Sequence, residues 1–354
     1  MPTSSPNVFD IIKTLTELPG PVGMEEPVQD WIAERWSRFA DVRRTRVNNI
    51  VARVGGSGPK LAFMAHADEI CFMVKSVSDD GFLYLWPYYG DTRGAPPKWV
   101  MPLNQPALVI TPTGTIEGVF ATASGHVVSI KERNTGGWEW NDWFVDLGAT
   151  SRAEVEAMGI HPGCRVIWNP PTRRLGDHRI SGKAMDDRAA LAIATLAAER
   201  LAARSDLAYE LWLVSTIQEE AGLQGAHSIA DAIDIDLCIN LDVGLVGDIP
   251  GPDKRDFPNV MGGGPAVVYH DSSAHYSWKL NERIIEVART AGISVQRAIY
   301  QNYGSDASAL LKRGTEIALV TYPTRYTHSP VEMVDERDIE AAVDLLVAFA
   351  TTQP

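Results

Sequence analysis

Five short polar segments carry the side chains of this chain that could do acid–base or metal chemistry. Each contains a histidine or carboxylates, and three of the five directly follow or end an apolar run typical of a β-strand. In open α/β sheets, ligand sites form outside the carboxyl ends of the strands, so we expect these side chains to meet at one rim. The segments are His66–Glu69, Asp186–Arg188, Gln218–Glu220, Asn240–Asp242 and Tyr326–Ser329.

The carboxylates of this set need a counter-charge. Asp186, Glu220 and Asp242 would repel one another and raise one another's pKa if they met without one. Two divalent cations about 3.5–4 Å apart would remove that repulsion, polarise a carbonyl group and generate hydroxide near neutral pH. Together with His66 and His328, the donors are nitrogen and oxygen only, which suits Zn²⁺, Co²⁺ or Mn²⁺. The residue types therefore indicate a hydrolase with two metal ions.

Each segment also has an ordinary structural interpretation when taken alone. His66 could be a histidine satisfied at the end of a strand, and His328 an ordinary loop residue. Asp186 and Asp187 could cap a helix and favour its dipole, and the Glu219–Glu220 pair could be a solvated turn before a glycine. These interpretations explain the set only if all five segments fall at the ends of elements by accident, which favours the joint hypothesis.

The surrounding elements predict a three-layer α/β sandwich around a mainly parallel sheet. Apolar strands alternate with amphipathic helices after residue 182, a pattern typical of parallel sheets covered on both faces. The expected strands are Lys60–Ala65, Leu211–Val214, Leu237–Leu241 and Ala318–Val320, and the expected helices are Val8–Leu18, Glu26–Phe39, Asp187–Ala203, Gly225–Ala232, Lys279–Thr290 and Arg337–Ala350.

A different composition marks the middle of the chain. Residues 71–164 are rich in Gly, Pro, Thr and Trp, with short alternating runs and only one helical period, at Arg152–Met158. We interpret residues 71–164 as a small β-rich domain inserted into a larger domain formed by residues 1–70 and 165–354. The Trp-rich segment at 136–144 could be an interface or domain core, and we favour an interface.

Composition excludes several function classes. The 354 residues carry 32 Lys and Arg against 45 Asp and Glu, a net charge of −13. With no basic run, the chain is a poor partner for nucleic acid or an anionic membrane. Three widely spaced cysteines argue against a disulfide scaffold. No secretory signal and no apolar run of about 18 residues is found, so we expect a cytoplasmic enzyme.

The ordered set of motifs resembles a known family, the tetrahedral or glutamyl-type metallo-aminopeptidases, which are family forty-two of the metallopeptidases in clan MH. The resemblance covers both halves of the larger domain in the family's order. Its motifs are HADEI (66–70), SGKAMDDRAALA (181–192), IQEEAGLQGA (217–226), INLDVGLVGDIPG (239–251), GSDAS (304–308) and PTRYTHSPVEMVD (323–335).

The resemblance implies a role for each matching residue. His66 would bind one metal ion and His328 the second, while Asp186 would bridge both, with a cis peptide bond after it. Glu220 and Asp242 would each complete one metal's ligand shell. Sequence alone leaves open whether Asp186 or Asp187 is the bridging residue.

Three further side chains have implied roles around the metal ions. Asp68 would orient the His66 imidazole. Glu219 would be the general base that takes a proton from water and returns it to the leaving amine. Asp306, in the GSDAS motif, would lie near the substrate pocket.

The resemblance also implies what the enzyme would act on and how it would assemble. It implies removal of N-terminal residues from peptides, a PDZ-like fold for the insert and its use in dimerisation, with dimers or tetrahedral dodecamers as the homo-oligomer. The chain departs from the family by having Cys71 where a glycine is usual after DEI and by lacking the Lys-Pro-Pro-His segment of the insert. These departures leave the ligands unchanged and the assembly state open.

Other functions stay open at this point. A clan MH deacylase or carboxypeptidase would use similar ligands but recognise an acyl group or a carboxylate. A glycoside hydrolase needs paired carboxylates and no metal, which would leave His66 and His328 without a purpose. A catalytically inactive assembly protein would not need all five ligands.

No GxSxG, HExxH or reactive-cysteine signature is present, which argues against serine, cysteine and single-zinc hydrolases. His270 and His275, after a run of three glycines, suggest a substrate-side or interface loop.

Overall fold

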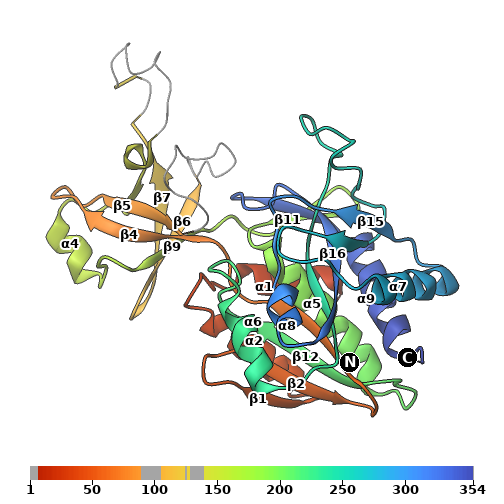
Figure 1. Ribbon diagram of the computed structural model, residues 1–354. Helices are drawn as coiled ribbons and strands as arrows, with labels where there is room; N and C mark the ends of the chain where they lie inside the picture. The colour runs from red at the N-terminus through yellow and green to blue at the C-terminus, as the bar shows by residue number, and fades with distance from the viewer. Residues whose placement is uncertain (1–6, 89–104, 124–125, 128–138, 354) are drawn as a thin grey trace, which may run out of the picture. The chain divides into compact units, whose positions relative to one another are not determined.

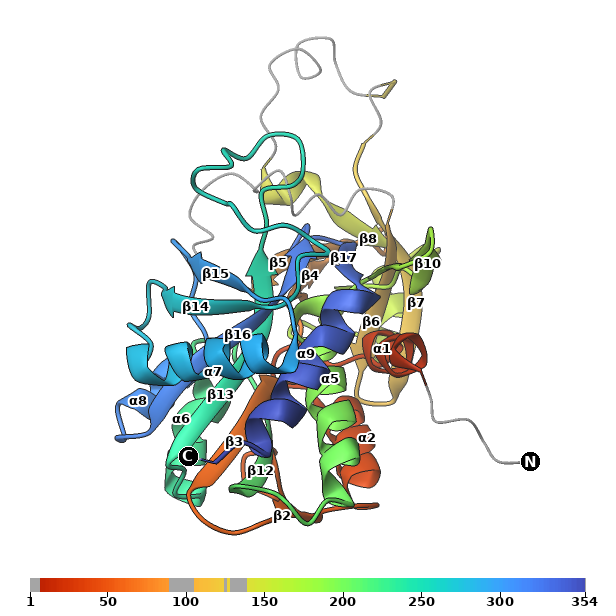
Figure 2. The ribbon, with the colours of Figure 1, turned by 90° about the vertical axis from the view of Figure 1, so that its right-hand side faces the viewer.

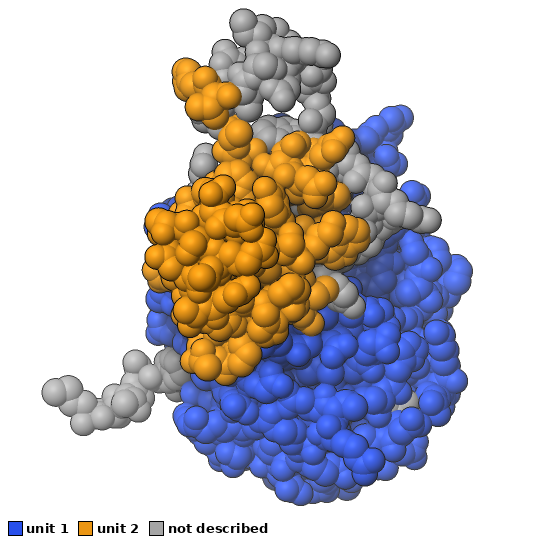
Figure 3. Space-filling view, turned by 90° about the vertical axis from the view of Figure 1, so that its left-hand side faces the viewer, with its two compact units in different colours: residues 1–69, 172–327, 332–354 blue, residues 70–171, 328–331 orange. Residues whose placement is uncertain are grey.

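The computed structural model describes residues 7–88, 105–123, 126–127 and 139–353. The chain divides into two compact units, coloured separately in Figure 3. The first unit comprises Met1–Glu69, Thr172–Thr327 and Glu332–Pro354, and the second comprises Ile70–Pro171 with His328–Val331. No helix within the described residues is long and apolar enough to cross a membrane.

A twisted sheet forms the centre of the first unit (Figure 1). Strands β12, β3, β13 and β16 run parallel to their neighbours at its middle. The described strands of this sheet are β1 (Asp41–Arg44), β2 (Ile50–Gly55), β3 (Lys60–His66), β10 (Arg173–Leu175), β11 (Arg179–Gly182), β12 (Glu210–Thr216), β13 (Leu237–Leu245), β14 (Ala266–His270), β15 (Gln296–Ile299), β16 (Glu316–Arg325) and β17 (Glu332–Asp335).

The prediction of a mainly parallel sheet is wrong, because the sheet is mixed. Strands β1, β2, β10, β11 and β17 all pair antiparallel with their neighbours. Short connections explain several of these pairings, since a tight turn can join only antiparallel strands. Asn48 turns the chain between β1 and β2 with a φ of 79°, and Gly176 does so between β10 and β11 with a φ of 61°. The apolar runs that the sequence shows most clearly belong to the parallel middle.

Helices cover both faces of the sheet, as Figure 2 shows. Alternate residues of β3 enter different cores: Leu61 and Phe63 pack into one, and Ala62 and Met64 into the other. This alternation is the period of a strand that is buried on both faces. The first core is covered by α1 (Val8–Glu17), α2 (Glu26–Trp36), α5 (Met185–Ala202), α7 (Trp278–Ala291) and α9 (Glu336–Ala350), and the second by α6 (Gln224–Ala232) and α8 (Ala307–Leu311).

The predicted helices and strands of the first unit are present within a few residues of their expected bounds. Helix α1 shows the local reasons. The Asn7 side chain accepts a hydrogen bond from the Asp10 amide and caps the first turn, which satisfies a donor that the helix leaves unpaired. Ile11, Ile12 and Leu15 lie on the buried face, and the helix ends shortly before Pro19, which cannot continue it.

A closed barrel forms the second unit, in the strand order β4-β5-β8-β7-β6-β9. Phe72 and Trp168 meet edge to face in its core at a centroid distance of 5.2 Å, a favourable aromatic geometry. Its described elements are β4 (Cys71–Val77), β5 (Leu83–Tyr88), β6 (Pro106–Thr111), β7 (Gly114–Ala121), the short helix η2 (Trp140–Asp142), β8 (Phe144–Asp146), α4 (Arg152–Ala157) and β9 (Arg165–Trp168). The PDZ-like character of the insert stays a prediction.

The barrel core corrects one expectation from the sequence. We favoured an interface for the Trp-rich segment 136–144, yet Trp143 is buried in the barrel and Trp140 packs against the same core. The two rings meet edge to face at 5.4 Å, so Trp143 fills part of the barrel interior and the partly buried Trp140 covers it. Residues 136–138 lie outside the described residues. Cys71 is also buried, at the start of β4.

Candidate metal centre

Three predicted ligands of the first unit lie on or just after neighbouring parallel strands, whereas the fourth, Asp186, lies in the first turn of α5. His66 is the last residue of β3 and pairs in register with Thr216 at the end of β12, after which the chain turns into Glu219 and Glu220. Asp242 lies in the adjacent strand β13. The rim that the sequence predicted is therefore formed by strands that are distant along the chain but adjacent in the sheet.

His66 is the centre of the cluster. Its Nε2 atom lies 3.1 Å from Oδ1 of Asp186. Donor atoms of His66, Asp186, Asp187 and Asp242 all lie within 4.8 Å of one another, and so do donor atoms of His66, Glu219 and Glu220. The structure thus brings three predicted ligands of the first unit, Asp186, Glu220 and Asp242, around the imidazole of the fourth, His66.

The two neighbouring aspartates have different surroundings. Asp187 accepts the backbone N–H of His66 at Oδ2 (3.2 Å) and the hydroxyl of Tyr322 at Oδ1 (2.7 Å). Asp186 faces the His66 ring, and its own N–H donates to the Glu332 carboxylate at 3.0 Å. The peptide bond between the two aspartates is cis. Because both oxygens of Asp187 already accept protein donors, Asp186 is the better candidate for a ligand.

Asp68 fastens the turn that carries Glu219 and Glu220. Its Oδ1 accepts the Glu219 N–H at 2.9 Å and its Oδ2 accepts the Glu220 N–H at 3.1 Å. Oδ1 also lies 3.4 Å from Nδ1 of His66, but this nitrogen has no hydrogen-bond partner among the described residues. One carboxylate therefore positions the backbone of the turn and lies beside the histidine.

Burial and crowding shift the ionisation of the cluster. Burial raises the pKa values of Asp187, Asp242 and Glu219 well above their usual range, neighbouring carboxylates raise them further, and the nearby His66 opposes these effects. Burial of the His66 ring lowers its pKa, but its contacts with Asp186 and Asp68 raise it well above normal overall. Carboxylates held this close inside a protein need a positive partner.

The donor set fits divalent metal ions. All donors are imidazole nitrogen or carboxylate oxygen, which suits Zn²⁺, Co²⁺ and Mn²⁺. Nδ1 of His66 is buried and has no hydrogen-bond partner in the described part of the chain. A cation would supply the positive charge that the crowded carboxylates lack.

The two remaining predicted site residues are Asp306 and His328. Asp306 is almost completely buried, and its Oδ2 accepts a hydrogen bond from Thr216. Burial is the main reason that its pKa is raised to about 7; His66 and the Thr216 hydroxyl lower it, and Asp68 raises it. His328 follows β16 in a left-handed conformation with a φ of 59°, within the segment His328–Val331 that groups with the second unit. Its role as a ligand stays a prediction.

Sequence reasoning missed three side chains that hold the cluster in place. Tyr322 contacts Asp187, Glu332 accepts the Asp186 amide, and Glu25 accepts the Gln218 amide at 3.3 Å. Tyr322 lies in β16 two residues beyond the apolar run at Ala318–Val320, and a polar group just past the predicted strand is a usable signal. Glu25 and Glu332 carry no such signal because they reach the site only through tertiary contacts.

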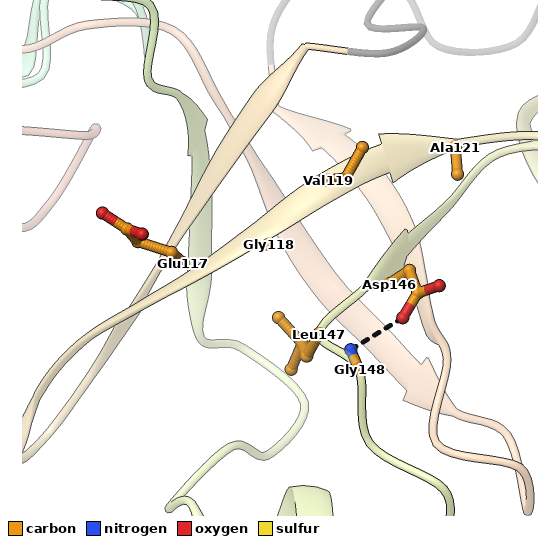
Figure 4. Close-up of a pocket in the computed structure, with 7 residues that line it drawn as sticks. All are labelled: Glu117, Gly118, Val119, Ala121, Asp146, Leu147 and Gly148. Carbon is orange, nitrogen blue, oxygen red and sulfur yellow. Dashed lines mark hydrogen bonds between the residues drawn. The ribbon is translucent and has the colours of Figure 1, made fainter.

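A groove in the second unit contains none of the predicted catalytic or metal-binding residues. It has a volume of about 570 Å³ and is lined by Glu117, Gly118, Val119, Ala121, Asp146, Leu147 and Gly148 (Figure 4). The Gly148 amide donates to Asp146 at 2.7 Å across one end. None of the predicted site residues lines this groove, so its size does not make it the catalytic site.

Comparisons with known proteins agree with this picture. The family described as M42 glutamyl aminopeptidase matches residues 48–345. A lysyl aminopeptidase from Pyrococcus furiosus is 30% identical, covering 96% of this chain and 96% of its own.

Solved structures share the fold at similar levels of identity. An aminopeptidase from the archaeon Desulfurococcus kamchatkensis superposes with a TM-score of 0.88 at 33% identity, covering 97% of this chain and 94% of its own. The TET1 peptidase of Pyrococcus horikoshii, described as assembling into a tetrahedron or a large octahedral shell, has a TM-score of 0.85 at 26% identity and covers 97% and 99% of the two chains.

Proposed function

Because the chain belongs to the M42 glutamyl aminopeptidase family, we propose that it is a metal-dependent aminopeptidase that removes N-terminal residues from peptides. The observation that carries this proposal is the buried cluster of His66, Asp186 and Asp242, with Glu219 and Glu220 beside the same imidazole. A structural core would not gather so many carboxylates around one histidine, because each one raises the cost of burying the others.

We assign the metal-binding roles as follows. Asp186 would bridge two divalent ions, Zn²⁺ or Co²⁺, with Mn²⁺ as a further candidate. His66 and His328 would serve one ion each, and Glu220 and Asp242 would complete the two ligand shells. When bound, the ions would polarise a peptide carbonyl and lower the pKa of water. Asp187 would stay outside this set because the His66 amide and the Tyr322 hydroxyl occupy its carboxylate.

Glu219 would be the general base. It would accept a proton from the attacking water at its carboxylate and donate that proton to the leaving amine. Burial raises the pKa of the Glu219 carboxyl well above its usual range, which favours its holding a proton taken from water. Asp68 holds the Glu219 amide at 2.9 Å, so the base would stand on a fixed turn. Asp306 is enclosed, and we propose that it supports the wall of the substrate pocket through Thr216.

We also propose that the protein works as a homo-oligomer. The TET1 peptidase of Pyrococcus horikoshii can assemble into a tetrahedron or a large octahedral shell, and this chain aligns with it over 97% of its length. The barrel of the second unit is the part that we propose for dimerisation. Light scattering of the purified protein distinguishes a dimer from a dodecamer.

Hydrolysis of aminoacyl-p-nitroanilides tests the function. The protein is stripped with a chelator, reloaded with Zn²⁺ or Co²⁺, and assayed on free-amine substrates, their N-acetylated forms and a soluble cellulose. We expect metal-restored cleavage of the free-amine set alone. Cleavage of the acetylated set would indicate a deacylase instead, and metal-independent cleavage of cellulose would indicate a glycoside hydrolase. Absence of all three activities in protein with two bound metals per chain would contradict the proposal.

A further inference from the structure

Three buried charged side chains lie within a few residues of the proposed ligands His66 and Asp186 but are not ligands themselves. They are Glu69, Lys183 and Arg188, and all three are almost completely inaccessible to solvent. The Lys183 ammonium lies 2.8 Å from each oxygen of the Glu69 carboxylate. The Arg188 guanidinium lies 3.4 Å from the same carboxylate. Two buried cations therefore share one buried anion.

The three residues are placed on the two segments that carry His66 and Asp186. Glu69 lies three residues after His66, beyond the end of β3. Lys183 and Arg188 flank Asp186 on either side. The contacts between the carboxylate and the two cations thus tie the end of β3 directly to the turn that begins α5.

The end of α1 and the loop after it are hydrogen-bonded to the same network. The Gly20 amide donates to Glu69 at 3.1 Å, and the Arg188 guanidinium donates to the carbonyls of Leu15 (2.8 Å) and Gly20 (3.2 Å). A Cβ atom at Gly20 would lie only 2.5 Å from the Arg188 guanidinium, so only glycine fits here without displacing it. One close-packed ionic network fastens three chain segments.

A purely structural role does not explain this network well. Burying charges costs several kcal/mol per ion before pairing, and replacing a buried ionic network by apolar residues of similar volume is often neutral or stabilising. The network contains two cations and one carboxylate, so it carries one extra positive charge, and acidic side chains surround it. Burial lowers the pKa of Arg188, but Glu69, Asp68 and Glu25 oppose that effect. The network thus lies where it can act on the position and charge of the metal-binding segments.

We propose that Glu69, Lys183 and Arg188 form a positioning cluster that sets the spacing of His66 and Asp186 and thereby the affinity for metal ions. These residues do not touch substrate. The inference rests on the proposed function, because it assigns the cluster to the same metal centre. Substitution of a residue that contacts and orients a metal ligand typically weakens metal affinity by about 10–100-fold.

Metal affinity of the Lys183→Met variant tests the cluster. Methionine keeps much of the side-chain length, and Arg188 still neutralises Glu69. We expect Co²⁺ and Zn²⁺ to bind about 10–100-fold more weakly in a chelator competition, while KM at saturating metal stays unchanged. The matched control is Arg200→Met in helix α5, which begins two residues after Lys183; it breaks only an exposed pair with Asp344 and should leave metal affinity unchanged.

A double variant separates position from charge. Glu69→Gln combined with Lys183→Met keeps the net charge of the cluster but removes the tie, so we expect the loss of affinity to persist. Recovery of wild-type affinity in the double variant would overturn the positioning role. A second result would also overturn it: if Lys183→Met lowers the thermal midpoint of the metal-free protein but leaves its metal affinity unchanged, the network has only a structural role. Failure of the wild-type protein to bind metal at all would instead contradict the proposed function.

Discussion

The buried carboxyl of Glu25 should make the stability of the protein depend on pH near neutrality. Glu25 precedes α2, and its Oε1 accepts the N–H groups of Gly23 (2.7 Å) and Gln218 (3.3 Å). Burial is the main cause that raises its pKa from 4.5 to about 7; the charge of Asp68 adds to this effect, and the backbone N–H groups oppose it. The folded protein therefore holds a proton on Glu25 at pH values where the unfolded chain has released it.

The sign and size of the effect follow from that difference. A raised pKa contributes stability that is complete below about pH 4.5 and is lost as the pH rises through about 7. At about 1.4 kcal/mol per pH unit, the full loss has an upper limit of about 3 kcal/mol. The Glu25→Gln variant has no proton to lose. Because both N–H groups bind one oxygen of Glu25, the amide oxygen of glutamine can accept both.

Urea unfolding of chelated protein at a series of pH values measures this. The stability of Glu25→Gln relative to wild type should rise by up to about 3 kcal/mol between about pH 4.5 and pH 7.5. The exposed neighbour Glu26 supplies the control, since Glu26→Gln removes one charge from the same turn without a buried carboxyl. A relative stability of Glu25→Gln that stays flat over this interval would refute the reasoning.

Three further predictions concern the proposed base, one ligand and the barrel core. Glu219→Gln should retain both metals but lower kcat by about 10²–10⁴; steady-state kinetics with metal analysis checks this, and near wild-type hydrolysis would show that another group is the base. Asp242→Ala should weaken binding at one metal site, so metal content after dialysis should fall, and unchanged stoichiometry would count against its role as a ligand. Phe120→Ala removes a fully buried ring that lies 5.4 Å from Phe72, and we expect the second unit to lose about 3–5 kcal/mol of stability; a loss below about 1 kcal/mol in chemical unfolding would mean that the barrel repacks around the gap.

Local patterns in the sequence predicted the helices and the parallel strands well. Helix α1 is marked by its cap, its apolar period and Pro19, all of which act within a few residues. Strand β3 is marked by an apolar run that is buried on both faces. The rim could be predicted for a related reason: the carboxyl ends of parallel strands meet at one edge of a sheet, so residues that follow such strands come together.

Other features depend on contacts that no local pattern records. The edge strands gave only short, weak runs, so their antiparallel pairing was missed and the sheet was expected to be mainly parallel. Trp140 and Trp143 lie in a segment without a clear period, and only the closure of the barrel buries Trp143 in its core and packs Trp140 against that core. Side-chain periodicity indicates which face is buried but not what covers that face.

The residues that can reach the rim, namely His66, Asp186, Glu220 and Asp242, could be recognised from the sequence because strand ends and the order of the motifs are local features. How these residues are held depends on tertiary contacts. In the folded chain the Asp68 carboxylate accepts the amides of Glu219 and Glu220. Both oxygens of Asp187 accept hydrogen bonds from protein donors, and Lys183 is buried against Glu69. The physical reason is that hydrogen bonds and ion pairs depend on distances of a few ångströms between segments far apart in the chain, and packing alone sets those distances.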